Sequence, residues 1–351
     1  METFTVKAFG TSAVDQDLNQ MEIKRRVTTA TDIEIEILYC GVCHSDLHTA
    51  RNDWGFTTYP AIPGHEIVGK VTKIGNEVTK LKVGDVAAVG CLVGSCGTCD
   101  SCKQDLEQYC ANGWVGTYNS PDKHLGGMTY GGYSQKVVVD QHFVLKVPSN
   151  LDLAATAPLL CAGITTWSPL RHWNATKGTK VAVVGLGGLG HMAIKLAKGL
   201  GADVTLFSRS PGKEKDAKDL GADAVIISTD ENQMNTVAGK FDVIIDTVPY
   251  VHDINPYINT LNISGTIVLV GYLGGLEPIL NTVPMIMGRK KVAGSLIGGI
   301  AETQEMLDFC GKHNIVSEIE IIKMQDINEA YERMLKSDVR YRFVIDMSSL
   351  T

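Results

Sequence analysis

Residues 180–210 read KVAVVGLGGLGHMAIKLAKGLGADVTLFSRS, and this stretch decides the fold of the second part of the chain. An apolar run, a glycine turn, an amphipathic segment and a second apolar run predict a strand, a turn, a helix and a strand. The turn GLGGLG matches G-x-G-x-x-G in the strand-to-helix context that makes this motif specific for a dinucleotide. Gly185 permits the tight turn, Gly187 lets the backbone approach a pyrophosphate, and Gly190 lets the helix pack on the strand. The alternative, an ordinary glycine turn, is disfavoured by the βαβ pattern around it.

The segment after the second strand predicts which dinucleotide binds. That strand, VTLF, runs into SRSPGK with no Asp or Glu to hold the ribose 2′-hydroxyl of NAD. Arg209 and Lys213 can instead pair with the 2′-phosphate of NADP, and Ser208 can donate a hydrogen bond to it. We therefore predict NADP, the alternative being that both cations are solvated surface charges. Two groups of residues are therefore assigned to the cofactor phosphates. The glycine turn and the positive end of the helix dipole contribute Gly185, Gly187, Gly188, Leu189 and Gly190. The segment after the second strand contributes Ser208, Arg209, Ser210 and Lys213.

The remaining sequence predicts two domains of different character. The later apolar runs AVII, FDVIIDTV, GTIVLVG and KVAGSLIG are mostly separated by helix-like stretches, which predicts a doubly wound parallel α/β sheet over residues 157–297. Residues 1–156 alternate short β-rich runs with Gly and Asp turns and predict a mostly β domain. Residues 298–351 contain two helical segments and a closing strand, and we assign them to the β domain.

Composition limits the classes of function. The 351 residues are 44% hydrophobic and 20% charged, which suits a two-domain globular protein. The net charge is −7 and no Lys/Arg run is present, so we expect no nucleic-acid partner. No apolar stretch approaches the ~20 residues that span a bilayer, and the N-terminus lacks the apolar region of a signal peptide. We therefore expect a cytoplasmic protein with no membrane partner. Disulfides among its nine cysteines are not expected, and the odd count and tight clustering of these residues point to metal binding instead.

Four cysteines form one compact metal-binding pattern. Cys96, Cys99, Cys102 and Cys110 are spaced C-x2-C-x2-C-x7-C, which suits a closed tetrahedral zinc site of structural type. An iron–sulfur cluster is the alternative, but the bacterial ferredoxin run ends C-x3-C-P, whereas here the last gap is seven residues and Ala111 follows.

Three further residues suggest a second metal. Cys43 lies in GVCHSDLH, His65 in PGHE and Cys161 in LLCAG, and a catalytic zinc takes three protein ligands with one open position. No short spacing links the three, so each remains open to an ordinary interpretation as a buried thiol or a hydrogen-bonded histidine. The other cysteines, Cys40, Cys91 and Cys310, are interpreted as structural.

Together these features resemble the medium-chain zinc-dependent alcohol dehydrogenases, and among them the cinnamyl alcohol dehydrogenase-like branch. The motifs that carry the resemblance run through the whole chain: GVCHSDLH, PAIPGHEIVGKVTKIG, the four-cysteine lobe, GGYS, CAGITTWSPL, GLGGLG and DVRYRFVID. The resemblance implies a GroES-like catalytic domain, a Rossmann domain and two zinc ions per chain. It also implies a homodimer in which the strand near VAGSLIG pairs across the two-fold axis.

The resemblance implies roles for individual residues. Cys43, His65 and Cys161 correspond to the catalytic zinc ligands, the Cys2His set for which alcohol dehydrogenases are themselves the standard example. Glu66 corresponds to a glutamate that can approach the metal, and Asp46 to a carboxylate that orients the histidine ligand. The remaining assignments are a proton relay of Ser45 and His48, with Asp53 as a further candidate, and a cofactor or substrate cleft containing Thr165, Val248, Ser295 and Ile297.

The implied activity is the interconversion of primary alcohols and aldehydes by hydride transfer with NADP(H), with aldehyde reduction favoured because cells keep NADPH reduced. Trp54, Trp114 and Ile297 are candidates for an apolar pocket wall suited to aromatic, allylic or medium-chain substrates, or else are ordinary core residues. One alternative is a polyol dehydrogenase, although those relatives commonly carry glutamate where this chain has Cys161. Another is a non-catalytic binding protein on the same fold.

Overall fold

The computed structural model describes residues 2–350 and divides into two compact units. Unit 1 comprises Met1–Cys161 and Gly298–Thr351, and unit 2 comprises Ala162–Ile297. The sequence pattern predicts the α/β domain over residues 157–297, and the structure has Ala162–Ile297 in unit 2.

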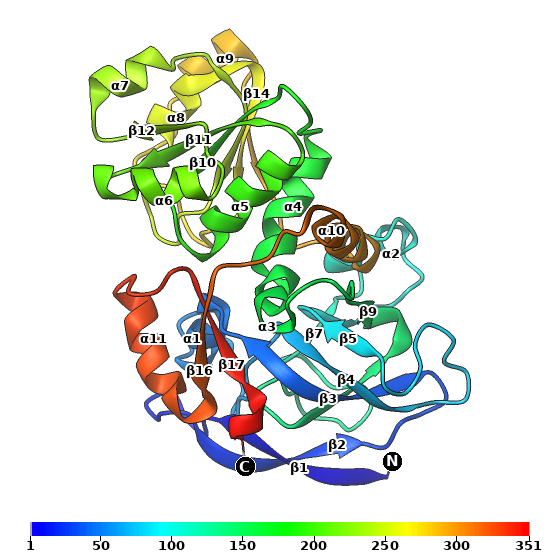
Figure 1. Cartoon of the computed structure of the whole chain (residues 1–351). Coiled ribbons are helices and arrows are strands. Elements are labelled where there is room, and N and C mark those ends of the chain that lie inside the picture. The colour runs from blue at the N-terminus through cyan, green and yellow to red at the C-terminus, as the bar shows by residue number, and fades with distance from the viewer. Residues whose placement is uncertain (1, 351) are drawn as a thin grey trace. The chain divides into compact units, whose positions relative to one another are not determined.

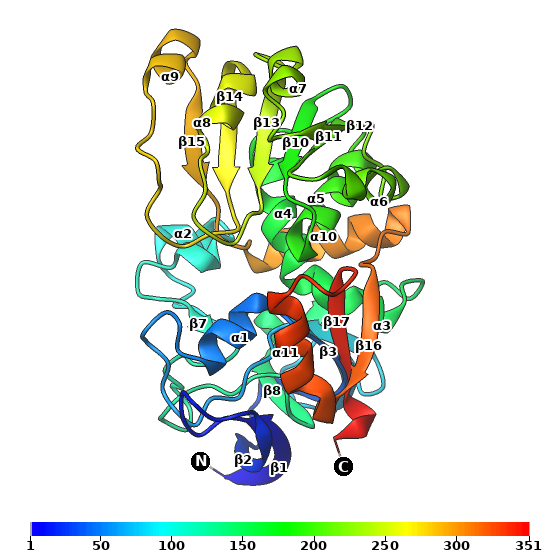
Figure 2. The same cartoon turned by 90° about the vertical axis from the view of Figure 1, so that its left-hand side faces the viewer.

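Unit 2 is built on one six-stranded parallel sheet, with strand order β12-β11-β10-β13-β14-β15 (Figure 2). The order reverses between β10 and β13, so the crossover helices of the two halves of the sheet lie on opposite faces, as in doubly wound folds. Helices α4 and α5 pack on one another, while α7, α8 and α9 form a second group. The strands are β10 (Lys180–Val184), β11 (Asp203–Ser208), β12 (Ala224–Ile227), β13 (Phe241–Asp246), β14 (Leu261–Leu269) and β15 (Lys291–Gly294). The helices are α4 (Ala162–His172), α5 (Gly188–Gly199), α6 (Glu214–Asp219), α7 (Glu231–Thr236), α8 (Asn255–Thr260) and α9 (Val283–Gly288).

Unit 1 contains a seven-stranded, mostly antiparallel sheet of order β16-β17-β3-β4-β5-β9, in which β8 also pairs with β3. The C-terminal strand β17 pairs with β3, so the last part of the chain completes the sheet begun near the N-terminus (Figure 1). Two-stranded sheets β1-β2 and β6-β7 accompany it. The strands are β1 (Thr3–Gly10), β2 (Asn19–Arg26), β3 (Asp32–Gly41), β4 (Ile67–Ile74), β5 (Val86–Val89), β6 (Leu92–Gly94), β7 (Val115–Gly116), β8 (Lys136–Asp140), β9 (Leu145–Lys146), β16 (Ile319–Lys323) and β17 (Arg342–Asp346).

The helices of unit 1 are short, apart from two near the C-terminus. The α-helices are α1 (His44–Ala50), α2 (Asp100–Lys103), α3 (Leu153–Thr156), α10 (Ile300–His313) and α11 (Ile327–Leu335). In the part of the chain that the structure describes, no single helix is long and apolar enough to span a membrane. One bent pair, Leu153–Leu160 with Ala162–His172, meets the length and composition limits together, but its apolar residues are buried in the protein.

The segment that joins the units explains the shifted boundary. The run LAATAPLLCAGITTWSPL has helical apolar spacing with Pro158 as a candidate interruption, and in the structure α3 ends at Thr156 and a 3-10 turn covers Ala157–Leu160. Pro158 lies in this turn, where its missing N–H and fixed φ interrupt a regular α-helix. A new helix, α4, begins at Ala162, so Cys161 is held in the break between two helical segments.

Candidate functional site

A buried cluster of metal-binding side chains lies in unit 1. One ligand atom each from Cys43, His65, Glu66 and Cys161 falls within 4.8 Å of the others. The two sulfur atoms of Cys43 and Cys161 are 3.9 Å apart. Cys43 lies between the end of β3 and the start of α1, while His65 and Glu66 immediately precede β4. Because β3 and β4 are antiparallel neighbours, the end of one strand lies beside the start of the next, and the turn before α4 supplies the last thiol.

Asp46 fixes the orientation of the imidazole. Its Oδ1 atom is 3.0 Å from His65 Nδ1 and also accepts a hydrogen bond from the backbone N–H of Gly64 at 3.0 Å. An Nδ1–H that donates to a carboxylate leaves Nε2 as the free ligand atom, as in metal sites with an oriented histidine. Although burial alone would lower the pKa of His65, the Asp46 carboxylate raises this pKa well above its usual value.

The second carboxylate of the cluster, Glu66, is held by a buried arginine. Arg342 donates from Nη2 to Glu66 Oε1 at 2.5 Å and to the backbone oxygen of Val42 at 2.7 Å. Within residues 2–350, the other carboxylate oxygen of Glu66 has no hydrogen-bond partner. Burial raises the pKa of Glu66 to about 7, even though the charge of Arg342 acts in the opposite direction. A side chain at Gly41 would overlap the Glu66 carboxylate, which explains the glycine two residues before Cys43.

The thiols of the cluster differ in their readiness to ionise. A hydrogen bond with Cys161 lowers the pKa of Cys43 well below that of a free thiol, and the nearby His65 and Arg342 act in the same direction. The pKa of Cys161 is raised because it donates to Cys43 and is buried. A thiolate is the form of cysteine that binds metal, so this pair has one sulfur poised as a ligand before a cation arrives.

The residues expected in the relay lie on α1 and in the turn after it. The Ser45 hydroxyl oxygen is 3.7 Å from the sulfur of Cys43. His48 is three residues further along the helix, which puts the two side chains on neighbouring positions of one face. His48 Nδ1 is 2.7 Å from a carboxylate oxygen of Asp53, whose side chain is 44% exposed. Ser45 thus lies beside the thiol cluster, and the His48–Asp53 pair is partly exposed at the protein surface.

The four-cysteine lobe forms a second cluster. The ligand atoms of Cys96, Cys99, Cys102 and Cys110 also lie within 4.8 Å of one another. Backbone N–H groups of Cys96, Cys99 and Ala111 point at the sulfurs of Cys110, Cys96 and Cys99, respectively. Hydrogen bonds from the backbone of Thr98 and Cys99 lower the pKa of Cys96 to about 5. Four thiols so arranged fill a tetrahedral coordination shell and leave no open position for chemistry.

The glycine turn of unit 2 has the geometry of a phosphate-binding loop. Gly185 has φ of +88°, which a residue with a side chain rarely adopts, and a Cβ at Gly190 would overlap the Gly185 carbonyl. Gly187 is the N-cap of α5, and a Cβ built there would meet no protein atom within 4 Å. Gly188 and Leu189 begin the helix, so their N–H groups lie at its positive end beside this open space.

The positions of the other predicted cofactor residues vary. Ser208 ends β11 and is buried, and its hydroxyl exchanges hydrogen bonds with the backbone of Ser210 at 2.8 and 3.2 Å. The exposed Arg209 guanidinium lies 5.4 Å from the ring centroid of Tyr250, and Lys213 follows on the next turn. The remaining predicted residues are Val248, half-buried after β13; Thr165, buried in α4; Ser295, half-buried after β15; and Ile297, buried with φ of +34°.

Comparisons with known proteins agree with this geometry. A family profile described as "Alcohol dehydrogenase GroES-like domain" matches residues 29–149, and one described as "Zinc-binding dehydrogenase" matches residues 188–312. The chain is 52% identical over 347 residues to "NADP-dependent alcohol dehydrogenase C 1" of Mycolicibacterium smegmatis, which covers 99% of both proteins. The chain belongs to the zinc-binding alcohol dehydrogenase family.

The structure of this family member is similar to solved structures of cinnamyl alcohol dehydrogenases. The enzyme from Sorghum bicolor matches with a TM-score of 0.94 and 45% identity, covering 98% of both chains. The cinnamyl alcohol dehydrogenase of Helicobacter pylori, solved in complex with NADP(H), matches with a TM-score of 0.91 and 42% identity over 99% of both chains. The predicted family, fold class and enzyme class are therefore confirmed.

Two aromatic residues proposed as pocket walls are not core residues of this alcohol dehydrogenase. Trp54 is half-buried and stacks on Phe56 with the ring centroids 5.7 Å apart, while Trp114 is 38% exposed. Sequence reasoning missed Tyr118, a half-buried residue whose ring centroid lies 5.4 Å from that of His65. It also missed Arg342, although a charged residue inside the apolar strand RFVID was a visible signal.

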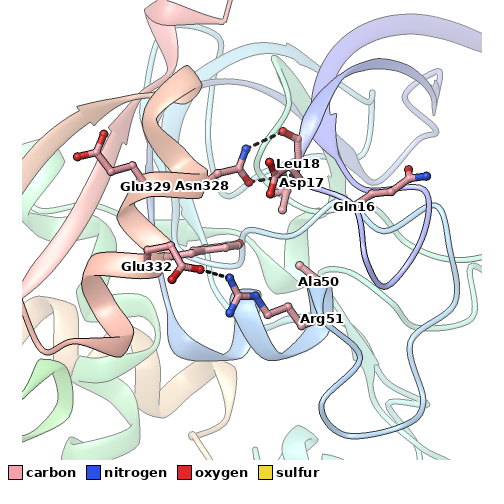
Figure 3. Close-up of a pocket in the computed structure, with 9 residues that line it drawn as sticks. Gln16, Asp17, Leu18, Ala50, Arg51, Asn328, Glu329 and Glu332 are labelled. Atoms are coloured by element: carbon pink, nitrogen blue, oxygen red, sulfur yellow. Dashed lines mark hydrogen bonds and ion pairs between the residues drawn. The ribbon is translucent and has the colours of Figure 1, made fainter.

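A separate pocket of about 270 Å³ lies in unit 1, and it contains none of the predicted site residues (Figure 3). The Asn328 amide exchanges two hydrogen bonds of 3.0 Å with the backbone of Leu18, and Arg51 pairs with Glu332 at 2.5 Å. These polar groups bind one another across the pocket, which indicates a structural role for this surface.

Proposed function

We propose that this chain binds two zinc ions and NADP(H) and interconverts primary alcohols and aldehydes, with aldehyde reduction as its main direction. The observation that carries this proposal is the buried cluster of Cys43, His65, Glu66 and Cys161. Two thiols and an imidazole are the three protein ligands of a catalytic zinc site, which keeps a further position open. The four-cysteine lobe is the complementary closed site.

The residues of the first cluster fit a zinc ion by chemistry as well as by distance. The lowered pKa of Cys43 favours the thiolate that binds metal, and the contact of Asp46 with Nδ1 leaves Nε2 of His65 available as a ligand. The unpartnered oxygen of Glu66 supplies a further donor that can approach the ion. When bound, zinc supplies a Lewis acid that lowers the pKa of an alcohol and polarises a carbonyl, and NADP(H) accepts or supplies the hydride.

The chain's own residues would move the proton of the reaction. Ser45 lies against the thiol cluster and can exchange a proton with a substrate oxygen. His48 is three residues further along α1, and its imidazole suits proton transfer near neutral pH. A carboxylate oxygen of Asp53 is 2.7 Å from Nδ1 of His48. The Asp53 side chain is exposed, which gives the proton a route to solvent.

Charge at the end of β11 supports NADP over NAD. The segment after β11 lacks a carboxylate, and Arg209 and Lys213 offer two cations for a 2′-phosphate. A close relative is named as NADP-dependent, and a related structure holds NADP(H). NADPH is the form that cells use for reduction, which favours the aldehyde as substrate. Trp54 and Tyr118 suit an aromatic, allylic or medium-chain aldehyde.

We also propose a cytoplasmic homodimer that binds neither nucleic acid nor membrane. Strand β15 is the last strand in the order of its sheet, so one side of its backbone has no neighbour in that sheet. Several apolar side chains of α9, which precedes β15, are strongly exposed, including Ile286 at 77% and Met287 at 82%. Pairing of two β15 strands across a two-fold axis would cover both features.

One set of measurements tests the function. The purified protein is analysed for zinc, and oxidation of NADPH and NADH is followed with cinnamaldehyde, benzaldehyde, short aliphatic aldehydes and fructose. We expect about two zinc ions per chain, a preference for NADPH and turnover of at least one aldehyde. No turnover of any aldehyde by zinc-loaded protein would contradict the proposal.

Fructose is included because of a second candidate function. The chain is 53% identical over 349 residues to a Medicago sativa protein named "Probable mannitol dehydrogenase". Faster reduction of fructose than of every aldehyde would favour a polyol dehydrogenase. The presence of Cys161 rather than a glutamate in the cluster argues for the aldehyde.

A further inference from the structure

Asp46 is fully buried, and three of its hydrogen-bond donors within residues 2–350 come from the segments that carry the proposed zinc ligands. The N–H of Cys43 donates to Oδ2 at 2.9 Å, and the N–H of Gly64 and His65 Nδ1 donate to Oδ1 at 3.0 Å. A further donor is the hydroxyl of Tyr133, which donates to Oδ2 at 3.1 Å. Tyr133 belongs to the motif GGYS, 87 residues further along the chain, and no part of the proposed function uses it.

The turn that carries Tyr133 is fixed by a buried arginine from β2. Arg25 donates to the backbone oxygens of Lys136, Tyr130 and Gly131 at 2.7–2.9 Å, and to the Ser134 hydroxyl at 2.8 Å. Burial lowers the pKa of Arg25 to about 10, and a cation so buried requires such partners. Four bonds from one rigid guanidinium set the shape of this turn.

The same turn is hydrogen-bonded to the backbone before His65. The N–H groups of Gly131, Gly132 and Tyr133 donate to the oxygens of residues 62, 64 and 63 at 2.7, 2.7 and 3.0 Å. A side chain at Gly131 would overlap the backbone of residues 63–64, and a side chain at Gly132 would overlap the side chain of Ile67. The two glycines therefore permit the close approach that brings the Tyr133 hydroxyl to Asp46.

Tyr133 is itself fully buried, with its ring against Gly64. Burial, and then the charge of Asp46, raise the pKa of Tyr133 well above its usual value, so the hydroxyl keeps its proton. A protonated phenol beside a carboxylate can serve it only as a hydrogen-bond donor.

We propose that Tyr133 is a positioning residue for the catalytic zinc site. Its hydroxyl fixes the Asp46 carboxylate so that Oδ1 holds Nδ1 of His65, which sets the direction of Nε2 toward the metal. The inference rests on the proposed zinc site. Without the hydroxyl, Oδ2 keeps the N–H of Cys43 but loses the Tyr133 donor, and a buried carboxylate oxygen that loses a donor is less firmly held in its orientation.

The test is Tyr133→Phe, which removes one oxygen atom and keeps the ring. Groups that orient a metal-bound histidine typically change metal affinity by about 10–100-fold when they are removed, so we expect a loss of about tenfold. Affinity is measured by competition with a chromophoric chelator. The d–d absorption of cobalt(II) in place of zinc reports the ligand geometry independently of turnover, and Cys161→Ser identifies which part of the band belongs to this site.

Tyr59→Phe is the matched control. The Tyr59 hydroxyl donates to the backbone oxygen of Ala50 at 2.9 Å, so this variant also loses one tyrosine hydrogen bond, but none to Asp46. We expect its metal affinity and cobalt spectrum to match those of the wild type. Arg25→Lys is a second variant that keeps the hydroxyl and the positive charge but loosens the turn, and it should change both readouts in the same direction as Tyr133→Phe by a smaller amount.

A Tyr133→Phe protein with wild-type metal affinity and an unchanged cobalt band would overturn the proposal, even if its melting temperature fell. Should Tyr133→Phe fail to fold, a wild-type affinity and spectrum for Arg25→Lys would have the same consequence. A wild-type protein with no Cys161-dependent cobalt band would instead contradict the zinc site itself, so the two failures can be told apart.

Discussion

Replacement of Arg209 by glutamine should reduce the preference for NADPH over NADH. The guanidinium is exposed after β11 and packs on the Tyr250 ring at 5.4 Å, which restricts its freedom before a ligand arrives. A hydrogen bond to a charged group contributes about 1.5–3 kcal/mol, and exposure favours the lower end. At about 1.4 kcal/mol for each factor of ten, Arg209→Gln should weaken NADPH binding about tenfold. NADH has no 2′-phosphate, so its affinity should change little.

The assay is a fluorescence titration of the zinc-loaded protein with NADPH and NADH at fixed ionic strength. Lys215→Gln is the matched control, because it removes one positive charge from the exposed start of α6 without occupying the turn after β11. Screening weakens such a distant charge, so the control should shift NADPH affinity far less than Arg209→Gln does. Equal weakening of NADPH and NADH by Arg209→Gln, or an equal effect of Lys215→Gln, would refute the assignment of Arg209 to the 2′-phosphate.

Three further outcomes are expected. Cys161→Ser should abolish aldehyde reduction at a nearly unchanged melting temperature, whereas Cys99→Ser should chiefly lower the melting temperature and the zinc content. His48→Gln should lower kcat, and added imidazole should partly restore it; a variant that turns over at the wild-type rate without added imidazole would contradict the relay. The hydrogen bond with Glu107 raises the pKa of His142, so its stabilisation is complete below about pH 6.5 and is lost as the pH rises through the raised pKa. Since His142 is half-exposed, His142→Gln should cost at most about 1 kcal/mol in urea unfolding at pH 5.5 and nearly nothing at pH 8.5.

The features that the sequence predicted well are those encoded within a short stretch of chain. The βαβ pattern of residues 180–210 contains its own strand, turn and helix, so periodicity and glycine placement suffice to predict unit 2. The four-cysteine lobe is equally local, with its ligands inside residues 96–110. Both predictions use contacts between residues close in sequence, which are the contacts that spacing can report.

The proposed catalytic cluster could not be recognised from spacing because its members meet only through the fold. The ligand Cys43 follows β3, His65 precedes β4 and Cys161 lies in the break before α4. Their proximity depends on the pairing of β3 with β4 and on the interruption of a helix near Pro158. The helical apolar spacing of this segment and the interruption expected at Pro158 can both be inferred from the sequence, but the proximity of Cys161 to the other ligands cannot.

The groups that orient the cluster are further removed from any motif that names a ligand. Arg342 reaches Glu66 from 276 residues away, and Tyr133 reaches Asp46 from 87 residues away. Arg342 and Tyr133 are both buried against these carboxylates. Replacing either residue would keep the metal ligands in the sequence but remove a hydrogen bond that holds Glu66 or Asp46 in place. A related chain with both cysteines and the histidine but without these two residues would therefore keep the composition of a zinc site and lose its geometry. The presence of ligand motifs is thus a weaker indication of catalysis in this family than the presence of the ligands together with the buried donors that hold their carboxylates in place.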